Sequence, residues 1–196
     1  MECDWEVEIA PEGPVIDVAW SGYIDLRLTP SRISQIHEGD QLPTLHDVLI
    51  RLNSNSSPVW TAKCDVWVPD SFDHREMDAG PEAAISGLAS YIDLIPADAR
   101  LASVLDDIVD WCRRLCLDLK ARPSSCCRID AIVRRACITT DAEGFGVTMY
   151  VGACGESPEE ASKALSFALT TMTDSVMAVG DSSQQASKYN RNIVGE

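Results

Sequence analysis

Apolar and polar residues alternate along six stretches of this chain, the pattern of a β-strand with one buried face and one polar face. In the longest, Ile16, Val18 and Trp20 alternate with small or polar residues, so we expect these three side chains to point inward. The predicted strands are 4–9, 15–28, 59–68, 85–95, 126–138 and 147–153. Asp141 to Gly144 joins the last two with a sequence typical of a hairpin turn.

Between these strands, apolar residues recur every three or four positions, as they do on the buried stripe of an amphipathic helix. Two stretches with this spacing, 42–52 and 101–119, are predicted to be helices. Ser157 is followed by a proline and then by Glu160, which together match a helix N-cap with a capping box. We expect a third helix to begin there and to end at about Val179.

The tetrapeptide Tyr-Ile-Asp-Leu occurs twice, at 23–26 and at 91–94, each time inside a predicted strand. A helix-period stretch and a further strand follow each copy. This pattern indicates two β-α-β pseudo-repeats, at about 13–69 and 80–138. Two such units in one sheet give a ferredoxin-like arrangement, in which the first strands of both units lie side by side and antiparallel at the centre.

The predicted fold class is therefore α+β: a ferredoxin-like pair of β-α-β units, an extra N-terminal strand, and a C-terminal hairpin strand plus helix. Residues 1–180 are expected to form a single domain, and the Ser/Gln/Asn-rich residues 181–196 a weakly ordered tail. The N-terminal strand has no free neighbour in this arrangement. An alternative, in which each repeat builds its own small sheet, stays open.

Acidic residues outnumber basic ones by 31 to 16, which leaves a net charge of −15. Nucleic-acid affinity depends on contacts to phosphates, so this charge argues against a nucleic-acid partner. The acidic N-terminus does not match a signal peptide, and no apolar run is long enough to span a membrane. These features predict a cytoplasmic protein that does not bind membranes.

If helices cover the apolar face of the sheet, the strands display their polar residues on the other face, and we expect any binding site there. The candidate residues are Tyr23, Asp25, Arg27, Lys63, Asp65, Trp67, Tyr91, Asp93, Arg128, Asp130 and Arg134, with Tyr150 beside them. Asp25 and Asp93, on adjacent strands, would be placed to act as acid and base or to bind a cation. The competing interpretation is cross-strand ion pairing with the basic residues of the same face.

The eight cysteines show no pattern that favours a metal site or disulfides in a chain without an export signal. Cys112 and Cys116 share a helix with the spacing of a zinc knuckle, but Cys126 and Cys127 are adjacent in a strand and point to opposite faces. Core packing of reduced thiols is favoured instead. Cys154 precedes a helix N-terminus, where a thiol can become nucleophilic. No cofactor is predicted, because neither glycine-rich nucleotide-binding motif is present.

The sequence thus favours an acidic binding protein that docks a protein partner, either a second copy or a basic protein, through a polar sheet face bearing aromatic residues. Two alternatives stay open. One is a small enzyme or cation-binding protein that uses the paired carboxylates of the two Tyr-Ile-Asp-Leu strands. The other is a homo-oligomer, such as a dimer, whose sheet faces pack together.

Overall fold

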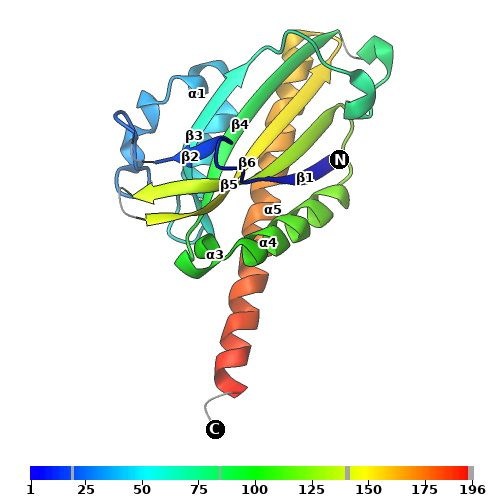
Figure 1. The fold of residues 1–196 in the computed structure, drawn as a ribbon. Coiled ribbons are helices and arrows are strands. Elements are labelled where there is room, and N and C mark those ends of the chain that lie inside the picture. The colour runs from blue at the N-terminus through cyan, green and yellow to red at the C-terminus, as the bar shows by residue number, and fades with distance from the viewer. Residues whose placement is uncertain (19, 84, 140–141, 194–196) are drawn as a thin grey trace.

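The alternating strands assemble into one mixed β-sheet in the computed structural model (Figure 1), which describes residues 1–18, 20–83, 85–139 and 142–193. The strands are β1 (Glu2–Glu8), β2 (Val15–Asp17), β3 (Val59–Trp67), β4 (Ser86–Pro96), β5 (Cys127–Thr139) and β6 (Ala142–Gly155). Their order is β1-β5-β6-β4-β3, and β2 pairs with β5 beyond the end of β1. β1 and β2 run parallel to β5, whereas the other neighbours are antiparallel. The predicted α+β class is confirmed.

Three longer helices, α2 (Pro43–Leu52), α4 (Leu105–Lys120) and α5 (Pro158–Ile193), pack their apolar stripes on one face of this sheet. Shorter helical turns are η1 (Pro30–Gln35), α1 (Glu38–Gln41), η2 (His74–Met77), η3 (Pro81–Ala83) and α3 (Ala99–Ser103). Figure 1 shows α5 crossing the sheet and continuing well beyond it. Within the described ranges, no helix combines the length and apolar character that crossing a membrane requires.

The main core lies between the sheet and these helices. Ile129 and Val133 of β5, Met149 of β6, Trp111 of α4 and Leu165 of α5 are each at most 1% exposed. Fully burying one such side chain stabilises the fold by about 1.5–3 kcal/mol. Because alternate residues of each strand enter this core, the remaining ones are directed to the face that the three helices leave uncovered.

Ser157 caps α5 as predicted, since its Oγ accepts a hydrogen bond from the Glu160 N–H at 3.3 Å. The Glu160 carboxylate in turn accepts from the Glu156 N–H at 3.0 Å. The predicted end of this helix near Val179 is wrong, because α5 continues to Ile193. Of the predicted tail, residues 194–196 lie outside the described residues, as does Asp141 of the predicted hairpin turn.

The predicted strand 15–28 is the main error in the fold. Among the described residues of this range, only Val15–Asp17 form a strand in the sheet, and the first Tyr-Ile-Asp-Leu copy lies in a loop. Gly22 has a φ of +121°, which breaks extended backbone. The Asp25 carbonyl then accepts hydrogen bonds from the Leu28 and Thr29 N–H groups, which close a local turn. The second copy, in contrast, lies within β4.

β6 occupies the central position that was predicted for residues 15–28. It lies between β4 and β5 and is antiparallel to both, so β4, α4 and β5 form a parallel unit with β6 inserted. A tight hairpin brings β6 beside β5 with little loop entropy, an advantage that the distant N-terminal segment lacks. The two Tyr-Ile-Asp-Leu copies are therefore not neighbouring strands, and the proposed duplication stays a prediction.

Candidate functional site

The sheet face that α2, α4 and α5 leave uncovered is called the open face here. Strand register places one row across it, from β3 to β1: Asp65, Tyr91, Tyr150, Asp130 and Asp4. Predicted site residues from β3, β4 and β5 thus share one surface. An apolar cluster closes one end of this face, with Trp60 of β3, Ile95 of β4 and Ala136 of β5 packed against Ile16 of β2.

Three aromatic rings follow one another along the open face. The Trp67 and Tyr91 ring centroids lie 6.2 Å apart, and those of Tyr91 and Tyr150 lie 5.9 Å apart. Burial is the main cause that raises the pKa of Tyr91 to about 12. Trp67 is 36% exposed, so the row offers accessible ring surface next to carboxylates. Such a row can contact apolar groups and the cationic side chains of a partner.

Asp93 lies at the centre of the open face and is only 6% exposed. One carboxylate oxygen accepts a hydrogen bond from the Thr148 hydroxyl at 2.6 Å. Burial raises the pKa of Asp93, although this hydrogen bond and the nearby positive charges of Arg134 and Lys63 oppose the rise. A buried carboxyl of this kind is unusual on a sheet face and is a frequent feature of functional sites.

Arg134 links Thr148, the hydrogen-bond partner of Asp93, to Glu8 in β1 at the edge of the sheet. Its guanidinium donates to the Thr148 hydroxyl at 3.2 Å and to the Tyr150 hydroxyl at 3.3 Å, and it forms an ion pair with Glu8 of β1 at 2.8 Å. The Arg134 side chain is 12% exposed. Its charge is thus directed toward Glu8 rather than into a direct ion pair with Asp93.

Arg128 and Asp130 form a second ion pair, with two guanidinium nitrogens within 3.0 Å of the carboxylate oxygens. The hydrogen bonds that Arg128 donates to the Asp130 carboxylate raise the pKa of Arg128 above its usual range. These residues line a pocket of about 400 Å³, whose wall also includes Asp4, Glu6 and Tyr150. Glu76 of η2 lines it as well. Four carboxylates therefore surround one arginine, and the pocket carries net negative charge.

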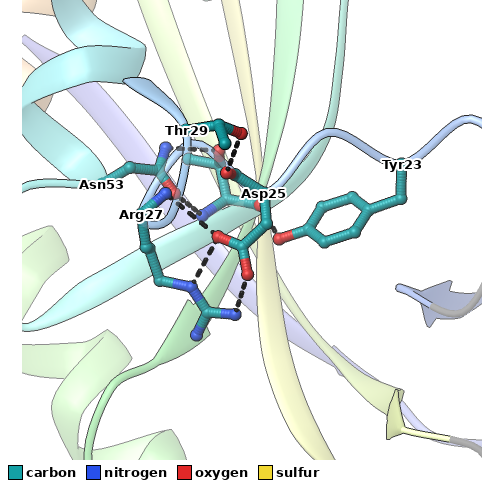
Figure 2. Close-up of polar contacts among 6 residues, drawn as sticks. Tyr23, Asp25, Arg27, Thr29 and Asn53 are labelled. Carbon is teal, nitrogen blue, oxygen red and sulfur yellow. Dashed lines mark hydrogen bonds and ion pairs between the residues drawn. The ribbon is translucent and has the colours of Figure 1, made fainter. Parts of the chain in front are cut away.

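Tyr23, Asp25 and Arg27 are not on a strand of the sheet, which corrects the strand placement predicted for these three residues. They lie in the loop after β2 (Figure 2), where Arg27 and Asp25 form an ion pair at 2.7 Å. The hydrogen bond from Arg27 is the main cause that lowers the pKa of Asp25. The Arg27 guanidinium stacks 3.8 Å from the Trp60 ring centroid. Asp25 is thus paired with Arg27, one of the basic residues expected as its partner, but within a loop and not across strands.

Asn53 fixes the edge of β3 beside this loop (Figure 2). Its buried side chain donates to the Leu49 carbonyl at 2.8 Å and to the Thr61 hydroxyl at 2.7 Å, and accepts from the Thr61 N–H at 3.1 Å. The Tyr23 hydroxyl donates to the Thr61 carbonyl at 3.4 Å. Polar groups of this strand edge are thus bonded within the chain, which discourages pairing with another strand there.

Lys63 of β3 points to a second pocket, of about 500 Å³, between β3 and the loop residues. Its ammonium lies 5.6 Å from the Trp20 ring centroid. Trp20 is 41% exposed and lines this pocket, so the prediction that it enters the core with Ile16 and Val18 is wrong. Asp65 and Tyr91 line both this pocket and the adjacent part of the open face.

The cysteines form two separate groups. Cys112 and Cys116 of α4 interact with Cys3 of β1, and hydrogen bonding to Cys116, together with burial, raises the pKa of the Cys3 thiol. Cys126 contacts Cys154, whose pKa burial raises to about 11. Cys154 is 1% exposed, which favours core packing over a nucleophilic thiol at this position. Across the residues with described positions, no group of three His, Cys, Asp or Glu side chains is arranged to hold a metal ion.

Sequence reasoning missed the acidic edge of the open face. Register places Glu2, Asp4, Glu6 and Glu8 of β1 opposite the open-face residues of β5. The signal was present, since every second residue from 2 to 8 is acidic. It could not be used without knowing that β1 pairs with β5. Thr148 was also missed, because a hydroxyl within an alternating strand carries no distinguishing pattern.

Comparisons with models of protein families, with curated proteins and with solved structures each find no match to this chain. The chemistry of the described residues is therefore the basis for assigning a function.

Proposed function

We propose that this protein binds a basic segment of a partner protein on the open face. The observation that carries the proposal is the acidic edge of β1, where Glu2, Asp4 and Glu6 flank a row of accessible aromatic rings. The net charge of −15 attracts a cationic partner over a longer range and favours rapid association. The same charge argues against a nucleic-acid partner.

The 400 Å³ pocket supplies a specific position for one lysine or arginine side chain of that segment. Asp4, Glu6 and Glu76 offer carboxylates there, while the charge of Asp130 is already paired with Arg128. The Tyr150 ring lines the same pocket, so a bound cation can lie against an aromatic face as well as beside carboxylates. Charge and ring surface together favour a cationic side chain over an apolar one.

A second candidate function rests on Asp93. A buried carboxyl with a raised pKa has the property of a general acid or base, which favours a small enzyme. The paired-carboxylate form of this hypothesis required Asp25 beside it, and Asp25 lies in the loop with Arg27. Asp93 alone is the weaker basis, because its neighbours Thr148 and Arg134 already form a bonded network.

The test is binding of a fluorescently labelled Lys/Arg-rich peptide, measured by anisotropy at several salt concentrations. The open-face variant is Asp4→Asn with Glu6→Gln. The matched control is Asp106→Asn with Glu159→Gln, which removes the same charge at the first turns of α4 and α5. We expect the open-face variant to weaken binding about three- to tenfold, since exposed ion pairs contribute about 0.2–1 kcal/mol each.

The control should bind with nearly the affinity of the unmodified protein. Equal losses in both variants would mean that the peptide responds only to overall charge, and the proposal would fail. Light scattering on the same samples measures self-association. A stable dimer whose formation is lost in the open-face variant would favour a second copy as the occupant, and would also contradict the proposal.

A further inference from the structure

The 500 Å³ pocket beside β3 is a separate feature from the acidic pocket of the open face, and its size lies in the range of small-molecule sites. Its lining includes the buried Leu26 and Leu49 together with the half-buried Ile24 and Ile36. These side chains come from the loop after β2, from α2 and from the residue that directly follows η1. The pocket therefore offers an apolar surface that can take a hydrocarbon or aromatic group.

Lys63 supplies the positive charge of this pocket. Among the described residues, no hydrogen bond or ion pair is formed by its ammonium, which lies over the Trp20 ring instead. Gly22 leaves room for the Trp20 ring, since a Cβ at that position would lie 2.7 Å from it. The absence of a Cβ at Gly22 thus allows the tryptophan to form one wall beside the ammonium.

Negative charge lines the same pocket. Glu38, at the start of α1, is half-buried, and Asp65 of β3 is exposed. The segment that carries Glu38 is attached to α2 by a hydrogen bond. A ring nitrogen of His46, in α2, lies 2.9 Å from the carbonyl oxygen of Ile36. Gly39 leaves room for that imidazole. The carboxylate of Glu38 is therefore carried by a short segment that is anchored to a longer helix.

We infer that this pocket binds a free α-amino acid with an apolar side chain. A simple anion would meet the carboxylates of Glu38 and Asp65, and a simple cation would meet Lys63. A zwitterion carries both charges, so its carboxylate can pair with Lys63 while its ammonium pairs with Glu38 and Asp65. The apolar lining then takes the side chain. This inference does not depend on the partner proposed for the open face.

The experiment is isothermal titration calorimetry of the full chain with leucine, isoleucine, phenylalanine and tryptophan. Three matched compounds separate the contributions: 4-methylpentanoate lacks the ammonium of leucine, isoamylamine lacks its carboxylate, and alanine carries a methyl group in place of its isobutyl side chain. We expect saturable binding of at least one apolar amino acid. Each incomplete compound should bind about tenfold more weakly or worse, the loss of one charge-assisted hydrogen bond or of the apolar contact.

Variants locate the binding. Lys63→Met should weaken binding of the preferred amino acid about tenfold, whereas Lys163→Met on the exposed surface of α5 should leave it unchanged. Thermal unfolding of both variants checks that the fold is retained. No saturable binding of any of the four amino acids up to about 10 mM would overturn the inference. Equal affinity for the incomplete compounds, or equal affinity of the two lysine variants, would overturn it as well.

Discussion

Replacing Asp93 with asparagine tests the electrostatics at the centre of the open face. Because burial raises the pKa of Asp93, the folded state holds its proton more tightly than the unfolded state does. Ionising the carboxyl therefore costs stability as the pH rises from the unfolded pKa, about 3.9, through the raised folded pKa. Each unit of difference between the two values corresponds to about 1.36 kcal/mol.

Asparagine keeps the hydrogen-bond geometry and removes the charge. Its side-chain oxygen can still accept from Thr148, so the expected loss is the difference between a charged and a neutral hydrogen bond, about 1 kcal/mol. Asparagine is uncharged, so the variant no longer bears the free-energy cost of burying a carboxylate, and this gain offsets the weaker hydrogen bond. At neutral pH, Asp93→Asn should thus lie within about 1 kcal/mol of the unmodified protein. Asp93→Ala, which leaves the Thr148 hydroxyl without its acceptor, should lose about 1–3 kcal/mol.

The assay is urea unfolding of the unmodified protein and of Asp93→Asn, followed by circular dichroism at several pH values from acidic to neutral. It measures the free energy of unfolding of both proteins at each pH. The stability of the unmodified protein relative to the variant should fall as the pH rises above about 4 and then become constant. Taking the difference cancels the titration of the other groups. A relative stability that rises with pH would show that the carboxylate is stabilised in the fold, and would refute the reasoning.

Three further substitutions test the loop and the edge of β3 by the same unfolding assay. Asn53→Ala should destabilise the fold by about 2–3 kcal/mol, because it leaves the buried Thr61 N–H without its acceptor; a loss below about 0.5 kcal/mol would contradict this. Gly22→Ala should cost about 1–3 kcal/mol through its positive φ, and unchanged stability would show that the loop relaxes easily. Asp25→Asn should remove a stabilisation by Arg27 that is present above the unfolded pKa of about 3.9 and is lost on acidification through the lowered folded pKa. Identical pH profiles of this variant and the unmodified protein would exclude that contribution.

Local patterns predicted most of the elements but not their pairing. Alternation located β5 and β6, and the capping box located the start of α5, because both signals depend on residues that are close in sequence. The choice of neighbour in the sheet depends on contacts between distant residues. The position of β6 between β4 and β5 therefore could not be obtained from alternation alone.

The error over residues 15–28 has a specific physical cause. Tyr23 to Leu26 and Tyr91 to Leu94 are identical in sequence, yet the first copy follows a glycine with positive φ and its aspartate binds Arg27 two residues later. Such local side-chain bonds compete with strand pairing. In the second copy, Asp93 instead accepts from Thr148 of the neighbouring strand. Flanking residues and distant partners decided the structure of these two identical segments.

The positions of the candidate site residues could be predicted from the sequence wherever the strands that carry them could be predicted. Lys63, Asp65 and Trp67 belong to β3, and their neighbours on β4 and β5 were also expected on the polar face. Tyr23, Asp25 and Arg27 were misplaced together with their strand. Glu2, Asp4 and Glu6 were missed because their importance depends on the parallel pairing of β1 with β5.

The most direct measurement of the central proposal is a map of backbone amide shifts by NMR during titration with the Lys/Arg-rich peptide. The proposal predicts that saturable shifts concentrate on β1, on β5 and around Tyr91 and Tyr150 of the open face. They should decrease in the Asp4→Asn, Glu6→Gln variant. Shifts that concentrate on α2, α4 and α5, or that spread evenly over the acidic surface, would contradict it.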